Sequence, residues 1–159
     1  MTEYQTLINK FKFIDPKSIK NNIFQDLEID GFCFNVHDPD TISVLFTHNE
    51  EIIKYNLRLS GIDAPELHSK NANERELCIK GTDYLKSLIL NKIIKIKTFK
   101  PDKYGRMLVN IYDYDGSQCF NDLLIKMGYV RPYFGEKKLA WDLENSELLT
   151  NIEIVPDVI

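Results

Sequence analysis

The chain has 159 residues, a formal net charge of −4 and a hydrophobic content of 43%. This length is typical of one domain that buries its own core, and the acidic balance argues against a surface that coats nucleic acid through charge alone. Because the sequence has no apolar run of membrane-span length, no signal-peptide shape and no Cys-x-x-Cys pair, we expect a soluble intracellular protein without disulfides or a zinc site.

Residues 1–26 are predicted to form a helical extension. Thr2 and Gln5 have the spacing of a capping box. The apolar residues that follow at helical spacing are Tyr4, Leu7, Ile8, Phe11 and Ile14. We expect this helix to pack on the main domain, and a helix that binds a protein partner is the alternative.

After this extension the hydrophobic period changes to two, which is typical of strands. Three strands are predicted, near residues 32–36, 42–46 and 53–59. A helix follows, with Asn73 as its expected start. Gly81 lies on the apolar face of that helix, where the missing side chain allows close approach to a sheet.

Two more strands and a short helix complete the pattern. The strands are expected at residues 93–99 and 107–114, and Asn121 is expected to cap a helix that ends at Gly128. Five short strands with a helix after the third suit a β-barrel with helices (α+β), of the five-stranded oligonucleotide-binding (OB) type. A two-layer α+β sandwich is the alternative.

One stretch, residues 57–66, combines an arginine at a strand end with carboxylates in the next turn. Alternation along the strand puts Arg58 on the face opposite its leucine neighbours. A hard divalent cation needs carboxylates such as Asp63 and Glu66, and a phosphate group needs an arginine fork. A surface ion pair beside a polar turn would account for the same residues without any chemistry.

Two further clusters add to this stretch. Residues 38–41, Asp-Pro-Asp-Thr, put two carboxylates at a strand junction, and residues 102–106, Asp-Lys-Tyr-Gly-Arg, present a second arginine before a strand. Each cluster alone has the composition of an ordinary turn or loop. Together the three supply carboxylates for a metal ion and a water molecule, and two guanidinium groups for a phosphate.

In this combination the chain resembles the staphylococcal nuclease (thermonuclease) family. The family's Asp-Gly-Asp-Thr appears as residues 38–41, its Arg-Leu-x-x-x-Asp-x-Pro-Glu as residues 58–66, and its Asp-Lys-Tyr-Gly-Arg as residues 102–106. The resemblance implies a five-stranded OB-fold of the staphylococcal nuclease type. We accordingly divide the chain into an N-terminal helical extension (1–26) packed on the barrel, the nuclease-like domain (27–145) and a C-terminal tail (146–159).

The resemblance also implies a set of metal ligands for one Ca²⁺ ion. Asp40 and Asp63 would bind the ion through side-chain oxygens, the backbone carbonyl of Ala64 would add a ligand, and Asp38 would lie in the outer shell. Pro39 stands where the family usually has glycine. If that position needs a positive φ, proline cannot adopt it, and the loop must be rearranged.

For the reaction itself, the resemblance implies three catalytic residues. Arg58 and Arg106 would hold the phosphate, and Glu66 would either orient or deprotonate the attacking water. The residues expected to line the substrate pocket are Lys103, Tyr104 and Tyr133.

The function implied is a calcium-dependent nuclease, a phosphodiester hydrolase that acts on DNA or RNA, preferably single-stranded, and leaves 3′-phosphates. The alternative is a catalytically weak or inactive OB-fold module that binds nucleic acid or a protein partner.

Overall fold

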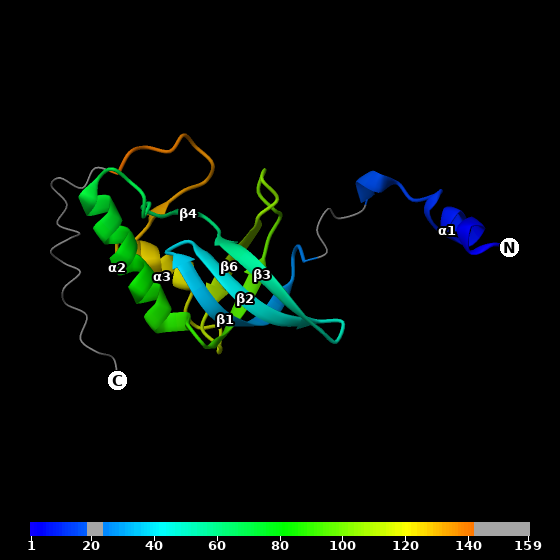
Figure 1. Cartoon of the computed structure of the whole chain (residues 1–159), viewed down its shortest axis with the longest axis horizontal. Coiled ribbons are helices and arrows are strands. Elements are labelled where there is room, and N and C mark those ends of the chain that lie inside the picture. Colours follow the sequence, from blue (N-terminus) through cyan, green and yellow to red (C-terminus); the bar gives the residue numbers. More distant parts are fainter. Residues whose placement is uncertain (19–23, 142–159) are drawn as a thin grey trace.

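The computed structural model describes residues 1–18 and 24–141. A closed five-stranded barrel with the strand order β1-β2-β3-β6-β5 forms its centre (Figure 1). The strands are β1 (Glu28–Asp38), β2 (Thr41–His48), β3 (Glu51–Leu59), β5 (Ile93–Thr98) and β6 (Met107–Tyr112). Neighbouring strands are antiparallel, except that β3 and β6 are parallel. The predicted barrel is therefore confirmed and the sandwich alternative is wrong.

The barrel core follows from the alternation of apolar residues along the strands. In β5, Ile94, Ile96 and Thr98 are buried while the residues between them are exposed. Ile94 and Ile96 belong to one apolar cluster with inward side chains of the other strands. The remaining helices and strands are α1 (Glu3–Phe11), the 3₁₀ helix Pro16–Ser18, β4 (Ile62–Asp63), α2 (Ala72–Ile89), α3 (Phe120–Lys126) and β7 (Arg131–Pro132).

Helix α2 lies along the outside of the barrel (Figure 1), and Gly81 brings it close to the β1–β2 turn. A Cβ atom at Gly81 would lie 2.9 Å from Pro39 Cγ and 3.1 Å from Tyr129 Cβ. This confirms the prediction that Gly81 permits close approach. The helix starts earlier than predicted, because Asn71 is its N-cap and accepts hydrogen bonds from the backbone N–H groups of Asn73 (2.9 Å) and Glu74 (3.4 Å).

Asn121 does not cap α3, and that prediction is wrong. Cys119 is the N-cap residue and makes no side-chain capping bond. The Asn121 amide is buried, accepts the backbone N–H of Ile111 at 3.0 Å, and donates to the carbonyls of Ser60 (3.0 Å) and Val109 (3.1 Å). It ties α3 to the end of β3, where the candidate site begins.

The N-terminal helix is capped as predicted, since Thr2 Oγ1 accepts the backbone N–H of Gln5 at 3.2 Å. Its apolar residues Tyr4, Ile8 and Phe11 are exposed, however, and α1 lies apart from the barrel (Figure 1). The structure thus differs from the expected packing, because periodicity identifies an apolar face and not what covers it. The tail at 146–159 lies outside the described residues, and within them no helix has both the length and the apolar character needed to cross a bilayer.

Candidate functional site

The turn between β1 and β2 carries two of the candidate metal ligands, Asp38 and Asp40. Asp38 Oδ1 accepts the backbone N–H of Asp40 at 3.1 Å, and the ladder pairs Asp38 with Thr41. Pro39 is buried between them and is not among the residues with positive φ. The turn is therefore closed by the Asp38 side chain in a backbone conformation that proline adopts.

Asp40 links this turn to the loop after β3. Its Oδ2 accepts the backbone N–H of Ala64 at 3.0 Å and lies 2.9 Å from Arg58 Nη1, and its Oδ1 accepts the Thr41 hydroxyl at 3.1 Å. Burial raises the pKa of Asp40 to about 7; the Arg58 guanidinium acts in the opposite direction and the nearby Asp38 carboxylate adds to the rise. The 2.9 Å contact with the Arg58 guanidinium favours the ionised form of the carboxylate.

Arg58 lies directly opposite Thr41 in the β2–β3 ladder, which explains why its guanidinium reaches the same corner. Besides Asp40, it donates from Nη1 to the carbonyl of Leu59 and from Nη2 to the carbonyl of Ile62, both at 3.0 Å. These bonds fix the guanidinium at the junction of β3 and β4. The remaining Nε–H and second Nη2–H have no acceptor within the described part of the chain.

Asp63 provides a second buried carboxylate next to Ala64, with 1% of its surface exposed. Its Oδ2 accepts hydrogen bonds from Arg131 Nε at 3.0 Å and Nη2 at 2.8 Å, and Lys138 Nζ lies 2.6 Å from its Oδ1. The pairing of β4 with β7 sets Arg131 opposite Asp63. The carboxylate is thus neutralised from the C-terminal side of the chain.

Glu66 is exposed, and its backbone is held by α2. Glu74, a buried residue of the first turn of the helix, accepts the Glu66 N–H at 2.9 Å through Oε1 and the Ser69 hydroxyl at 2.5 Å through Oε2. Arg75 adds a bond from Nη1 to the Ser69 carbonyl. The loop that carries Glu66 is therefore fixed at both ends by the start of α2.

The second arginine lies in the loop between β5 and β6. Arg106 Nε donates to Asp102 Oδ2 at 2.7 Å, and its guanidinium lies 5.6 Å from the centre of the exposed Tyr104 ring. Lys103 is also exposed, with its ammonium 5.1 Å from the same ring. The Arg106 side chain is 53% exposed, and its two terminal nitrogens make no hydrogen bond or ion pair within the described residues.

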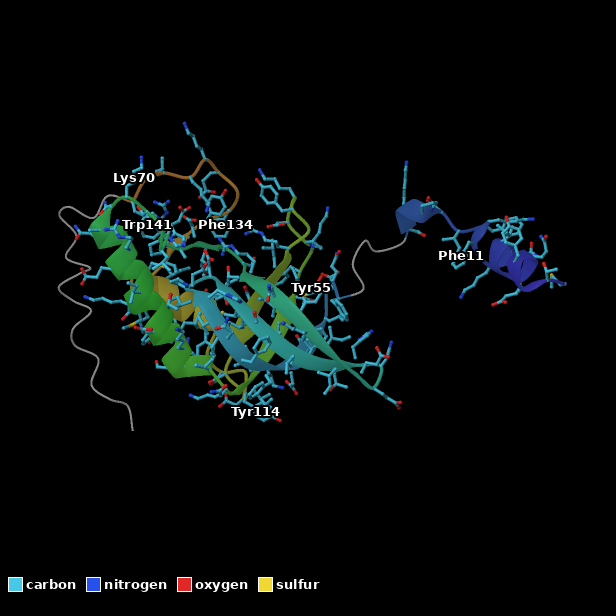
Figure 2. The ribbon with its side chains drawn as sticks, viewed as in Figure 1. Phe11, Tyr55, Lys70, Tyr114, Phe134 and Trp141 are labelled. Atoms are coloured by element: carbon cyan, nitrogen blue, oxygen red, sulfur yellow. The ribbon has the colours of Figure 1, made fainter. Side chains whose placement is uncertain are left out.

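A cavity of about 380 Å³ lies beside Asp63 and Glu66. Figure 2 shows Lys70 and Trp141 together at the end of the molecule where α2 begins. The lining of this cavity combines the start of α2 with the C-terminal end of the described chain. The lining residues are Asp63, Ala64, Glu66, Ser69, Lys70, Asn71, Glu74, Arg131, Lys138, Leu139, Ala140 and Trp141.

The structure brings some of the predicted site residues together and leaves others separate. Asp40, Arg58 and Ala64 share direct contacts, and Asp63 and Glu66 lie with Ala64 at the cavity. Tyr133 is joined to the site by its backbone N–H, which donates to the Gly61 carbonyl at 2.9 Å. Contacts that join Lys103, Tyr104 or Arg106 to this corner are absent within the described residues.

The oxygen donors at this site suit a hard cation, although they are few. Within residues 1–18 and 24–141, no three His, Cys, Asp or Glu side chains are grouped as a metal site. The oxygens on offer come from two buried carboxylates, Asp40 and Asp63, and oxygen is the ligand that hard divalent cations prefer. Within the part of the chain that the structure describes, Asp63 Oδ1 is also a buried side-chain atom without a hydrogen-bond partner, despite its close ammonium neighbour.

Sequence reasoning missed three residues of this region: Glu74, Arg131 and Lys138. Arg131 is one of only four arginines in the chain, and that scarcity was the one available signal. Glu74 and Lys138 resemble ordinary surface residues in sequence, because nothing local indicates which backbone or carboxylate they reach.

Comparisons with known proteins indicate the family of the chain. A family model described as staphylococcal nuclease homologue matches residues 56–152. An uncharacterized endonuclease of Escherichia coli O157:H7 is 33% identical over 101 residues, covering 64% of this chain and 59% of the relative. The thermonuclease of Staphylococcus hyicus is 32% identical over 101 residues, covering 62% and 56%.

A plant relative, the staphylococcal-like nuclease CAN1 of Arabidopsis thaliana, is 30% identical over 94 residues, covering 58% of this chain and 27% of the relative. The chain thus spans less than two thirds of the length of these relatives. The family match extends over more than half of the chain, from the middle of β3 through α2 and α3. On that match and on the closed five-stranded barrel, the chain belongs to the staphylococcal nuclease family.

Proposed function

We propose that the protein is a Ca²⁺-dependent nuclease that hydrolyses phosphodiester bonds of DNA or RNA, preferably single-stranded, and leaves 3′-phosphates. The observation that carries the proposal is the corner at Asp40, whose one oxygen contacts both Arg58 and the backbone of Ala64. Family membership and the nuclease names of the relatives support the same reaction class.

The metal would be held by the side-chain oxygens of Asp40 and Asp63 and by the carbonyl of Ala64, with Asp38 in the outer shell. When bound, Ca²⁺ would withdraw negative charge from the phosphate oxygens as the bond is broken. Because both carboxylates are buried, they would bind a cation in a site from which most water is excluded.

Arg58 would hold the phosphate with the two N–H groups that its contacts with the protein leave over. Its other three N–H groups fix the guanidinium, so it would require little reorganisation on binding. Arg106 would donate to the phosphate from its exposed terminal nitrogens. Lysine could supply the charge of either residue, but not the two-pronged geometry.

Glu66 would orient or deprotonate the attacking water, since its side chain is exposed at the cavity beside Asp63. Lys103, Tyr104 and Tyr133 would line the path of the nucleic acid. These groups address phosphate and base faces and not base edges, so weak sequence selectivity is expected.

The test is to incubate the purified chain with 5′-labelled single-stranded DNA and RNA, with Ca²⁺ or with a chelator, and to determine the end group of the products. Cleavage that requires Ca²⁺ and yields 3′-phosphate ends supports the proposal. Intact substrate under both conditions, with the substrate bound, would favour the non-catalytic module.

A further inference from the structure

The segment of residues 131–141 sets two cations against a single buried carboxylate. Arg131 donates twice to Asp63 Oδ2, at 3.0 and 2.8 Å, and Lys138 Nζ lies 2.6 Å from Oδ1. Only 2% of the Asp63 side chain is exposed. Each oxygen of the carboxylate therefore has its own cationic partner, and the two partners differ in how firmly the protein holds them.

Arg131 is held rigidly. Its Nη2 donates to the carbonyl of Leu139 at 2.5 Å, its Nη1 donates to that of Ala140 at 3.4 Å, and its guanidinium lies 4.3 Å from the centre of the Trp141 ring. The β4–β7 ladder fixes its backbone opposite Asp63. A guanidinium held through all three of its nitrogens can fix the carboxylate it binds, so Oδ2 is committed to Arg131 and Oδ1 is directed elsewhere.

Lys138 is held loosely by comparison. Its side chain is 52% exposed, and its ammonium also lies 5.6 Å from the centre of the Tyr133 ring. The contact with Oδ1 is close but does not have the geometry of a hydrogen bond, since this oxygen has no hydrogen-bond partner among the described residues. It is a charge contact, which another cation can replace.

We infer that Arg131 is a positioning residue that orients Asp63 for a divalent cation, and that Lys138 occupies the cation's place at Oδ1 until the metal binds. The inference rests on the proposed function, because it takes Asp63 to be a metal ligand. The inference does not depend on nuclease activity, so a measurement of metal binding alone can test it.

The two cations should therefore change metal affinity in opposite directions. Lys138→Gln removes a competitor and leaves Asp63 Oδ1 without its cationic neighbour, and both effects favour metal binding. We expect affinity for Ca²⁺ to rise about two- to fivefold, the upper part of the range of a partly exposed ion pair. Arg131→Lys keeps the positive charge but loses the paired contact with Oδ2, so we expect affinity to fall about tenfold.

The experiment is a calorimetric titration of the full chain with Ca²⁺ alone, for the wild type, Lys138→Gln, Lys138→Arg and Arg131→Lys. Lys138→Arg retains the charge and should remain near the wild-type affinity. Lys137→Gln is the matched control: it removes the same charge at the neighbouring exposed position, which has no ion pair among the described residues. Circular dichroism confirms that each variant is folded.

Affinity that rises in Lys138→Gln but not in Lys137→Gln, and falls in Arg131→Lys, supports the inference. If Arg131→Lys does not fold, the three lysine variants still decide the role of Lys138. Equal affinity in the wild type and Lys138→Gln would overturn the inference and leave the proposed nuclease intact. A wild-type chain that binds no Ca²⁺ would overturn both.

Discussion

Glu74 accepts the backbone N–H of Glu66 at 2.9 Å, so the first turn of α2 holds the residue expected to act on water. Its second oxygen accepts the Ser69 hydroxyl, which makes Glu74 a two-point anchor for the loop. We predict that Glu74→Gln, with only one acceptor oxygen, lowers kcat about ten- to a hundredfold through misplacement of Glu66, while KM changes little.

The control for this prediction is Glu76→Gln, a more exposed glutamate of the same helix that pairs with Lys80 at 3.0 Å. Steady-state rates on an oligonucleotide should be near those of the wild type in this variant. A loss of similar size in both variants would mean that the effect is general to α2 and does not arise from Glu66.

Gly81 is predicted to be intolerant of a methyl group. In Gly81→Ala the new Cβ would lie 2.9 Å from Pro39 Cγ and 3.1 Å from Tyr129 Cβ, and neither atom is at the end of a flexible side chain. The strain should lower the free energy of unfolding by about 1–3 kcal/mol, more than the gain of up to about 1 kcal/mol in helix propensity. Urea unfolding measures the difference. Asp83→Ala, at an exposed position of α2, should be neutral or stabilising, and a Gly81→Ala variant as stable as Asp83→Ala would contradict the packing.

Arg106 is predicted to matter for activity and not for stability. Its side chain is 53% exposed and its contacts are local, to Asp102 and Tyr104, so Arg106→Ala should change the free energy of unfolding by no more than about 0.5 kcal/mol. The rate of cleavage should fall on the order of 10³-fold or more, by analogy with arginines in phosphoryl transfer. Thermal unfolding and a cleavage assay on the same preparation check both values; full activity would remove Arg106 from the mechanism.

Cys33 is predicted to be unreactive at neutral pH. It is completely buried in β1, and burial raises the pKa of its thiol to about 11. Since the thiolate is the reactive form, the protonated thiol should not react until the pH approaches that value or the chain unfolds. With a thiol reagent at pH 8, the half-buried Cys119 should react first, and all three cysteines should react in urea. Rapid reaction of Cys33 in the native protein would show that β1 opens.

Much of the fold could be predicted because the signals are local. Alternating apolar residues identified the five barrel strands, and Gly81 indicated the close approach of α2. Asn121 shows where local reasoning fails: its position suits a helix cap, but its amide satisfies the backbone carbonyl of Ser60, 61 positions away. Which buried carbonyl needs a donor is a property of the assembled fold.

The candidate site, like the fold, could be predicted only in part. The closeness of Asp40 to Arg58, and of Asp63 to Glu66, could be predicted because the motifs that carry them are compact in sequence, whereas the roles assigned to these residues stay predictions. Arg131 could not, because it reaches Asp63 across 68 positions. The sequence also could not show whether α1 packs on the barrel, because an amphipathic pattern identifies an apolar face and not what it contacts. The apolar residues of α1 are exposed in the structure.

The most direct test of the proposed nuclease is the rate of Ca²⁺-dependent cleavage of single-stranded DNA by the wild type and by Arg58→Lys, purified in parallel. Arg58 is joined to Asp40, Leu59 and Ile62, and a lysine cannot keep these contacts and hold a phosphate as well. We predict cleavage by the wild type that stops on addition of chelator, and a rate about 10³- to 10⁵-fold lower in the variant. Equal rates in the two proteins, or cleavage that continues in the presence of chelator, would contradict the proposed site.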